Sequence, residues 1–285
     1  MQAMIVTAYQ DYEALRQVLD ALSKRALCFV HVDAKCAITQ EQTETLNRMQ
    51  NVRAIRRYKV NWGSVYHLHA LIDLCRMALE DPRVTHLHLI SAQDFPCVSA
   101  DAFERMFDGD DRIHMQSLVT AQYPELAHRY EHFHFMHLMN YRDMSERTQN
   151  WVGRIDRWQE KLHVRRKLNV ANKGLVWLSM PRAAAEHALN APENKRLLRK
   201  LRYTYIPEEF YFQNAFEGTP WAQKITGQEL RFSLWDSPER GLPALLDERD
   251  LERIDASGCV FCRKVIAGTA LYERLLACWL GEKSD

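Results

Sequence analysis

Two adjacent carboxylates, Glu208 and Glu209, directly follow Pro207 in the later half of the sequence. A proline at the first helical position and acids in the first turn are typical of a helix start, because the helix dipole attracts negative charge there. One interpretation is therefore an ordinary helix N-terminus. The other is that one carboxylate projects into a cleft as a general base, which the dipole keeps ionised at neutral pH. The spacing is compatible with both.

Two adjacent cations, Arg263 and Lys264, interrupt an otherwise apolar run at residues 259–265. The run has the character of a strand, in which neighbouring side chains point to opposite faces. Burying a cationic head group is costly unless it reaches water or an anion. We therefore expect at least one of the two cations to meet an anionic ligand or a buried acid.

Three groups of residues have side chains suited to metal ions. The four histidines from His128 to His137 could supply imidazole ligands; the aromatic residues among them favour packing, and metal binding by this cluster stays open. Cys259 and Cys262 are three residues apart in a predicted strand, which favours core thiols. The DGDD sequence at 108–111 contains a D-x-D pattern suited to divalent cations. Because it follows a predicted helix and contains a glycine, a solvated turn is favoured.

The composition excludes several classes of protein. The 285 residues carry 38 Lys and Arg against 37 Asp and Glu, a net charge of +1, so we expect no nucleic-acid partner. No apolar run approaches the roughly 18 residues that cross a bilayer, and the start of the sequence has no secretory signal pattern. Seven scattered cysteines give no disulfide framework. These features predict a cytoplasmic protein with free thiols.

Strands and helices alternate over the first hundred residues, which predicts an α/β fold with a mainly parallel central sheet flanked by helices. Ligands bind outside the carboxyl ends of such strands, here residues 8–10, 32–35 and 91–95. No glycine-rich phosphate cradle is present in the sequence, so phosphates would need other partners. The expected strands are 4–8, 26–32, 52–55, 85–90, 174–178, 230–234 and 259–265, and the expected helices include 40–49, 65–79, 151–162, 181–189, 194–201, 208–216 and 269–280.

Seven short segments recur in a recognisable order and spacing: IVTAYQ at 5–10, VHVDAK at 30–35, VNWG at 60–63, SAQDFP at 91–96, KGLVW at 173–177, PEE at 207–209 and FCRKV at 261–265. They resemble those of the core-2/I-branching β-1,6-N-acetylglucosaminyltransferases, a family that includes peptide xylosyltransferases. The resemblance covers about residues 4–265 and implies a GT-A type fold. Because the sequence has no repeat, low-complexity tract or Gly/Ser linker, we predict a single domain, 1–285, with a nucleotide-binding half at 1–115 and an acceptor-binding and catalytic half at 116–285.

The resemblance also implies an inverting reaction with a UDP-sugar donor and no metal cofactor. Glu209 would deprotonate the acceptor hydroxyl, and Lys264 would neutralise the departing diphosphate. This division of labour is coherent, since inverting displacement needs a base on one side and positive charge on the other. The remaining expected donor-binding residues are Thr7, Tyr9 (where the family usually has histidine), Asp33, Asp94, Arg240 and Arg263, and the expected acceptor-binding residues are Trp177, Glu208 and Trp235.

The leading hypothesis is a transferase that moves N-acetylglucosamine from UDP to a glycan or lipid-linked glycan built for the cell surface. Xylose is the next donor to test. Alternatives are a metal-dependent transferase using Asp94 or residues 108–111, a non-catalytic sugar-binding protein and, remotely, a zinc hydrolase. Two basic stretches, 154–168 and 195–202, could rest on the inner face of the membrane, although solvated helix faces often look the same.

Overall fold

A six-stranded sheet forms the centre of the computed structural model, which describes residues 1–9, 11–140 and 145–281. Gln10, at the end of the first of the seven segments, lies outside the described residues. The strand order is β3-β2-β1-β4-β9-β6, with β1 to β4 mutually parallel and β9 antiparallel to β4 and β6. The predicted α/β fold with a mainly parallel sheet is confirmed. The strands are β1 (Gln2–Ala8), β2 (Leu27–Val32), β3 (Val52–Ile55), β4 (His86–Ser91), β6 (His114–Met115) and β9 (Leu178–Pro181).

Two smaller sheets extend this centre. In the first, β11 (Phe261–Arg263) lies between β10 (Arg231–Ser233) and β5 (Asp94–Pro96). Because β11 runs antiparallel to β5, Arg263 stands opposite Asp94. The second pairs β7 (Leu118–Val119) with β8 (Asn172–Lys173). The cationic segment therefore lies beside the chain that leaves β4.

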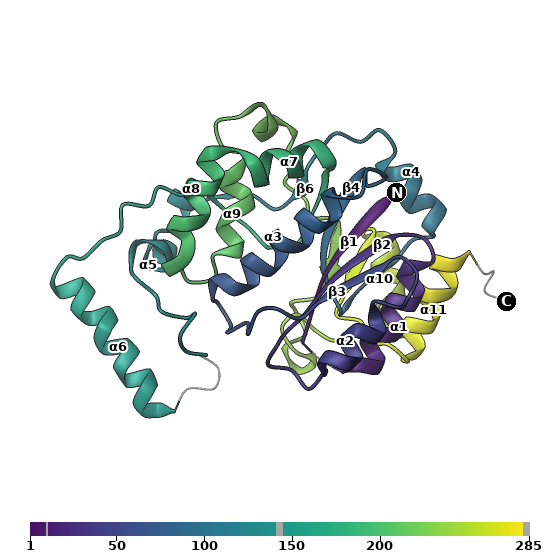
Figure 1. The fold of residues 1–285 in the computed structure, drawn as a ribbon, viewed down its shortest axis with the longest axis horizontal. Helices are drawn as coiled ribbons and strands as arrows, with labels where there is room; N and C mark the ends of the chain where they lie inside the picture. Colours follow the sequence, from purple (N-terminus) through teal and green to yellow (C-terminus); the bar gives the residue numbers. More distant parts are fainter. Residues whose placement is uncertain (10, 141–144, 282–285) are drawn as a thin grey trace.

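Helices cover both faces of the central sheet (Figure 1). Side-chain caps mark the starts of some of them: Asp11 accepts a hydrogen bond from the Ala14 N–H at 2.8 Å, and Thr39 forms a capping box with Gln42. The helices described in the structure, not all of which lie on the sheet, are α1 (Tyr12–Ser23), α2 (Gln40–Leu46), α3 (Val65–Leu79), α4 (Ala100–Phe107), α5 (Ala127–Glu131), α6 (Glu146–Lys161), α7 (Arg182–Asn190), α8 (Pro192–Lys200), α9 (Glu208–Ala215), α10 (Leu251–Ala256) and α11 (Ala270–Leu280).

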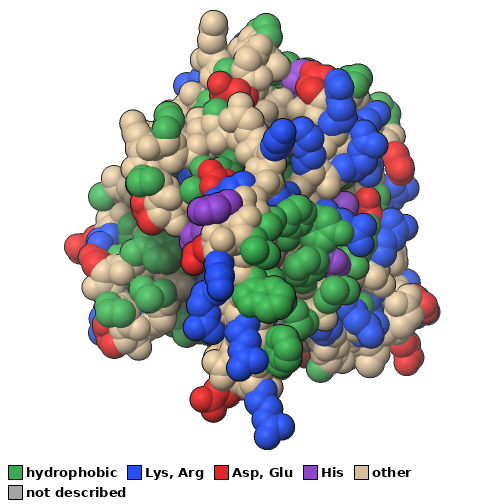
Figure 2. Space-filling view, turned by 90° about the vertical axis from the view of Figure 1, so that its left-hand side faces the viewer, with side chains coloured by type: hydrophobic (Ala, Val, Ile, Leu, Met, Phe, Trp, Pro, Cys, Tyr) green, Lys and Arg blue, Asp and Glu red, His purple; other side chains and the backbone are tan. Residues whose placement is uncertain are grey.

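Helix α6 lies at one end of the molecule, set apart from the other helices (Figure 1). Figure 2 views the molecule from that end, where hydrophobic side chains gather beside rows of Lys and Arg. Among the residues that the structure describes, no helix has the length and apolarity needed to cross a bilayer.

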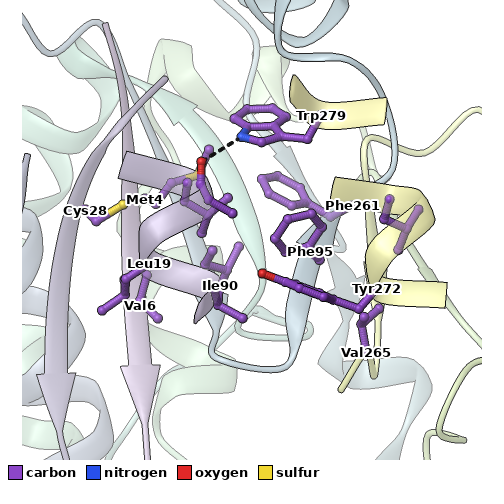
Figure 3. Close-up of a cluster of buried hydrophobic side chains, with 14 of the residues drawn as sticks. Met4, Val6, Leu19, Cys28, Ile90, Phe95, Phe261, Val265, Tyr272 and Trp279 are labelled. Carbon is purple, nitrogen blue, oxygen red and sulfur yellow. Dashed lines mark hydrogen bonds between the residues drawn. The ribbon is translucent and has the colours of Figure 1, made fainter. Parts of the chain in front are cut away.

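The sheet separates two hydrophobic cores, because successive strand side chains point to opposite faces. Along β1, Met4 and Val6 enter one core, while Ala3 and Ile5 enter the other. The first core packs beneath α1, α4 and α11, and Figure 3 shows part of it. There the Trp279 indole N–H donates to the Ala21 carbonyl at 3.1 Å, which anchors the last helix to the first. The second core packs beneath α3, α7 and α9.

The strand predicted at 174–178 is wrong: β8 ends at Lys173, and β9 begins only at Leu178. A close backbone approach explains the break. A Cβ added at Gly174 would lie 2.1 Å from the Gln116 carbonyl oxygen, and the Gly174 N–H donates to the Glu209 carbonyl at 2.9 Å. The segment is therefore a loop tied to the start of α9.

Candidate active site

The carboxyl ends of three parallel strands meet at one edge of the sheet. The Asp33 N–H, just after β2, donates to the Ala8 carbonyl at 2.8 Å, and the Ala92 N–H, just after β4, donates to the Thr7 carbonyl at 3.0 Å. This edge, formed by the chain around Thr7, Asp33 and Ala92, is where α/β sheets bind ligands. The helices α3 and α9 both begin close to it, as the contacts below establish.

A strained loop precedes α9 and places the start of this helix near the edge. Ile206 has φ of 54°, a left-handed conformation that is unfavourable for a β-branched residue. Its N–H donates to the Gly63 carbonyl at 2.9 Å, which joins the loop before α9 to the loop before α3. Gly63 allows this approach, because a Cβ there would lie 2.7 Å from the Tyr205 ring. Strain of this kind clusters at functional sites and persists only where surrounding contacts enforce it.

Glu209 forms an ion pair with Arg129 at this loop. The Arg129 Nη2 donates to Glu209 Oε2 at 3.0 Å, and the two side chains are 8% and 20% exposed. The guanidinium also lies 5.0 Å from the centre of the Phe210 ring. The ion pair holds the carboxylate in one position, and a fifth of the Glu209 side-chain surface is open to solvent or to a ligand.

Burial raises the pKa of Glu209 above its ordinary value, and Arg129 and Lys173 offset part of that rise while Glu208 adds to it. The sequence interpretation gave the opposite emphasis, since it expected the helix dipole to keep the carboxylate ionised. Desolvation by the packed loop dominates instead. A carboxylate with a raised pKa is a stronger base than one in water, which suits proton abstraction near neutral pH.

Glu208 points to a different partner. Its Oε1 lies 3.0 Å from His67 Nδ1, and the other nitrogen of that ring lies 3.5 Å from the Thr7 hydroxyl. His67 stands in the first turn of α3, so it connects the start of α9 with the end of β1. The Oε2 atom of Glu208 is buried and has no hydrogen-bond partner, so it retains the capacity to accept one.

A second pair of charged side chains, Asp94 and Arg263, lies at the segment after β4. Asp94 is fully buried, and its Oδ2 accepts hydrogen bonds from both the N–H and the hydroxyl of Ser91. Its Oδ1 lies 3.7 Å from Arg263 Nε, yet neither atom has a hydrogen-bond partner. The Arg263 guanidinium lies 4.2 Å from the centre of the Trp177 ring. The expectation that a cation of 263–264 meets a buried acid is confirmed.

The loop at 174–177 connects the two charged groups. It begins with the hydrogen bond from Gly174 to the Glu209 carbonyl and ends at Trp177 beneath Arg263. Lys264, the residue after Arg263, is half-buried, and its backbone N–H donates to the Ala244 carbonyl at 3.3 Å. The loop therefore links the backbone of the predicted base to one of the two predicted cations, Arg263.

Three other predicted ligand-binding residues occupy two different settings. Asp33 is buried, and its Oδ1 accepts from the N–H groups of Lys35 and Val60 at 2.9 and 3.1 Å. Tyr9 and Trp235 are both 54% exposed. The Trp235 indole N–H donates to the Ser233 hydroxyl at 3.1 Å, which leaves the ring faces accessible for stacking.

Arg240 has protein partners for its charge. Its Nη2 lies 2.6 Å from Asp250 Oδ2 and 3.1 Å from Asp247 Oδ2. This pairing fastens the loop whose Ala244 and Leu246 bond the backbone of Lys264. A donor phosphate at Arg240 would compete with two carboxylates, so its predicted donor role stays a prediction, and a supporting role for Lys264 is the simpler explanation.

The sequences considered for metal ions have other contacts. His134 and His128 bond backbone carbonyls of their own segment, and rings from this stretch pack against Tyr203 and Tyr205. In 108–111 the turn is present, but Asp110 is not solvated: burial raises its pKa, and hydrogen bonds from Arg112 and His114 outweigh this and lower it. Within the described ranges, no three His, Cys, Asp or Glu side chains are grouped to hold a metal.

The sequence matches the family model for the Core-2/I-branching enzyme over residues 3–255. The chain belongs to the Core-2/I-branching enzyme family. Membership in this family makes it a glycosyltransferase that uses a UDP-sugar, as the resemblance implied. Among curated proteins, no sequence matches the chain.

Two solved structures are similar to it at a distance. A 4-diphosphocytidyl-2C-methyl-D-erythritol synthase has 10% identity and a TM-score of 0.33, with 74% of this chain and 91% of that chain covered. The bifunctional glycosyltransferase WbbM has 10% identity and a TM-score of 0.40, with 98% of this chain aligned to about half, 52%, of that one. At such scores neither likeness bears on the activity of this Core-2/I-branching enzyme.

Two polar residues of this site were missed by the sequence interpretation. Arg129 lies inside the histidine-rich stretch, and nothing in its spacing indicates a partner 80 residues away. His67 carried a weak signal, because it is one of two histidines among the mostly apolar residues at the start of the helix at 65–79. The general rule that buried acids require partners could have prompted a search for both residues.

Proposed function

We propose that this enzyme transfers N-acetylglucosamine from UDP to a hydroxyl of a cell-surface glycan or lipid-linked glycan, with inversion and without a metal ion. The observation that carries the proposal is the pairing of Glu209 with Arg129 at the sheet edge. A carboxylate that is mostly desolvated, held by one cation and still partly open meets the requirements of a general base. No other described acid near this edge combines these three properties with a place in the PEE segment, which resembles an element of the family.

The proposed chemistry balances within the site. Glu209 takes the proton from the acceptor hydroxyl while that oxygen attacks the anomeric carbon of the sugar. The bond from that carbon to the diphosphate oxygen breaks, and its electron pair leaves with UDP. Attack from the face opposite the leaving group inverts the anomeric centre.

Fixed cations would stabilise the departing diphosphate. Arg263 ends β11 and Lys264 follows it, and the Arg263 side chain is 11% exposed. Preorganised positive charge of this kind can replace a bridging metal ion, since it neutralises charge as it develops. Asp94, opposite Arg263, would hold that guanidinium in place near the donor sugar.

Aromatic and acidic groups would bind the remaining parts of the two substrates. Asp33, Thr7 and Tyr9 would contact the nucleoside at the ends of β1 and β2. On the acceptor side, Trp235 offers an exposed ring on which a sugar can stack, and Glu208 and Trp177 would border the same space.

A screen of UDP-sugars, each with and without excess chelator, tests this proposal. We expect turnover with UDP-N-acetylglucosamine that chelator leaves unchanged. Preference for UDP-xylose would replace the donor assignment while keeping the mechanism. Loss of turnover on chelation would overturn metal independence. UDP binding without transfer to any glycan acceptor in the screen would favour a sugar-binding protein.

A further inference from the structure

One face of α6 carries large apolar side chains and cations together. With about 3.6 residues per turn, positions 147, 151, 154, 158 and 162 follow one another along one side of the helix. They are Arg147, Trp151, Arg154, Trp158 and, just after the helix end, Leu162. We call these five residues the tryptophan face.

The tryptophan face is open to solvent. Trp151 is 63% exposed, Trp158 is 70% exposed and Leu162 is 66% exposed, which places them among the most exposed large apolar side chains described. The Arg154 guanidinium lies 5.5 Å from the centre of the Trp151 ring. Figure 2 shows hydrophobic side chains beside Lys and Arg on this end of the molecule. The two indoles of this stripe therefore lie outside the buried cores.

The acidic residues of α6 lie off this face. At 100° per residue, Glu146, Asp156 and Glu160 fall on the remaining circumference of the helix. The tryptophan face therefore combines apolar surface with positive charge only. Such a pattern is complementary to an anionic surface that has an apolar layer beneath it.

A different side of α6 fixes the helix to the body. Gln159 is buried, its Oε1 accepts from the Phe133 N–H at 2.7 Å, and its Nε2 donates to the Phe133 carbonyl at 3.2 Å. Val152 is also buried and lines a small cavity with residues 133–136. These contacts hold the tryptophan face outward.

We propose that the tryptophan face binds the surface of an anionic phospholipid bilayer, with the two indoles at headgroup depth and the arginines on lipid phosphates. Indole rings favour this boundary because they have an apolar body and a polar N–H. Each nearby cation adds about fivefold to binding of an anionic membrane. The site goes beyond the proposed transfer reaction and does not depend on it. It would hold the enzyme where a lipid-linked acceptor is reached by diffusion in two dimensions.

Vesicle co-sedimentation of the full chain tests the site without measuring turnover. The probe is vesicles of phosphatidylglycerol and phosphatidylcholine in equal parts, against vesicles of phosphatidylcholine alone. We expect binding to the first, weakened by added salt, with a blue shift of tryptophan fluorescence. Replacing Trp151 and Trp158 by Ala should weaken binding about tenfold or more, because each indole buries up to ~200 Å². Both positions are exposed, so the double variant should keep its circular dichroism.

A charge-matched pair of variants separates this face from net charge. Replacing both Arg147 and Arg154 by Gln should weaken vesicle binding by about 25-fold, because each lost cation costs about fivefold. The control R196Q with Lys195→Gln removes two exposed cations of α8, which has no tryptophan, and should leave binding within about twofold. Equal loss in both pairs, or no binding of the wild type at low salt, would overturn the proposal. So would self-association abolished by the tryptophan substitutions with no vesicle binding, because the face would then join two copies.

Discussion

Replacing Arg129 by Met should shift the pH dependence of the enzyme. In the structure Arg129 donates to Glu209 at 3.0 Å and lowers the pKa of that carboxyl, against the rise that burial causes. An opposite charge in direct contact typically lowers a carboxyl pKa by about 1–3 units. Methionine keeps the aliphatic bulk and removes the charge, so the pKa of Glu209 should rise by about that amount.

The assay is kcat/KM as a function of pH, whose acidic limb reports the free enzyme's essential base. Because only ionised Glu209 accepts the proton, a higher pKa moves the acidic limb to higher pH by about 1–3 units. At a fixed pH well below the limb, each unit of rise in the pKa of Glu209 lowers kcat/KM about tenfold, while the plateau at higher pH should be largely retained. Arg129→Lys keeps a positive charge and should shift the limb less.

An acidic limb that stays in place in Arg129→Met would refute this reasoning. If the entire profile fell without moving, Arg129 would be holding the loop before α9 rather than setting the proton affinity of Glu209. Thermal unfolding of the variant separates the second case, since loss of the loop would lower Tm together with activity at every pH.

The remaining predictions concern support of the site and the acceptor. Gly174→Ala should lower the free energy of unfolding by about 2 kcal/mol or more, because the added Cβ would lie 2.1 Å from a carbonyl oxygen. The control Gly153→Ala places a Cβ in open space within α6 and should raise the free energy of unfolding by about 0.5–1 kcal/mol. Urea unfolding of both variants measures the difference. Arg240→Met should destabilise the fold by about 1–3 kcal/mol at neutral pH, since it leaves a buried carboxylate without its cation, and a large loss of UDP affinity at unchanged Tm would instead establish the donor role. Trp235→Ala should raise the acceptor KM about fivefold or more with little change in the donor KM, as expected for lost stacking; steady-state kinetics with each substrate varied would show whether the donor is affected instead.

The pH dependence of the Arg240 effect has a definite sign. Burial raises the pKa of Asp250, but hydrogen bonds from Arg240 and the Asp247 backbone outweigh it and lower the pKa below its ordinary value. A depressed carboxyl pKa contributes stability that is present above the unfolded pKa and is lost as pH falls through the folded pKa. The difference between wild type and Arg240→Met should therefore shrink in acid.

Elements with strong periodicity could be predicted from the sequence. The bounds of β3 and α3 were predicted as observed, since apolar runs and a one-sided helical pattern determine them locally. The start of α9 was also predicted, from Pro207 and the two acids after it. Helix α6 begins five residues before the predicted 151, because the Ser145 cap, rather than an apolar residue, sets its first turn.

Features that depend on distant contacts could not be predicted. The break at Gly174 arises from a carbonyl 58 residues earlier in the chain, which no local pattern contains. The raised pKa of Glu209 depends on packing around the loop, and its partner Arg129 comes from another element. The two acceptors that satisfy Arg240 lie seven and ten residues later, but only the folded loop brings both to it. Sequence patterns thus located the candidate residues and not their electrostatic partners.

The most direct test of the central claim is the turnover number of Glu209→Gln beside that of Glu208→Gln, with UDP affinity measured by calorimetry for both. Glutamine keeps the shape of the side chain and cannot take a proton, so Glu209→Gln should lower kcat by about 10²–10⁴ while UDP affinity is retained. Glu208→Gln should act mainly on the acceptor KM. Wild-type turnover in Glu209→Gln, or the large loss in Glu208→Gln alone, would contradict the assignment of Glu209 as the base.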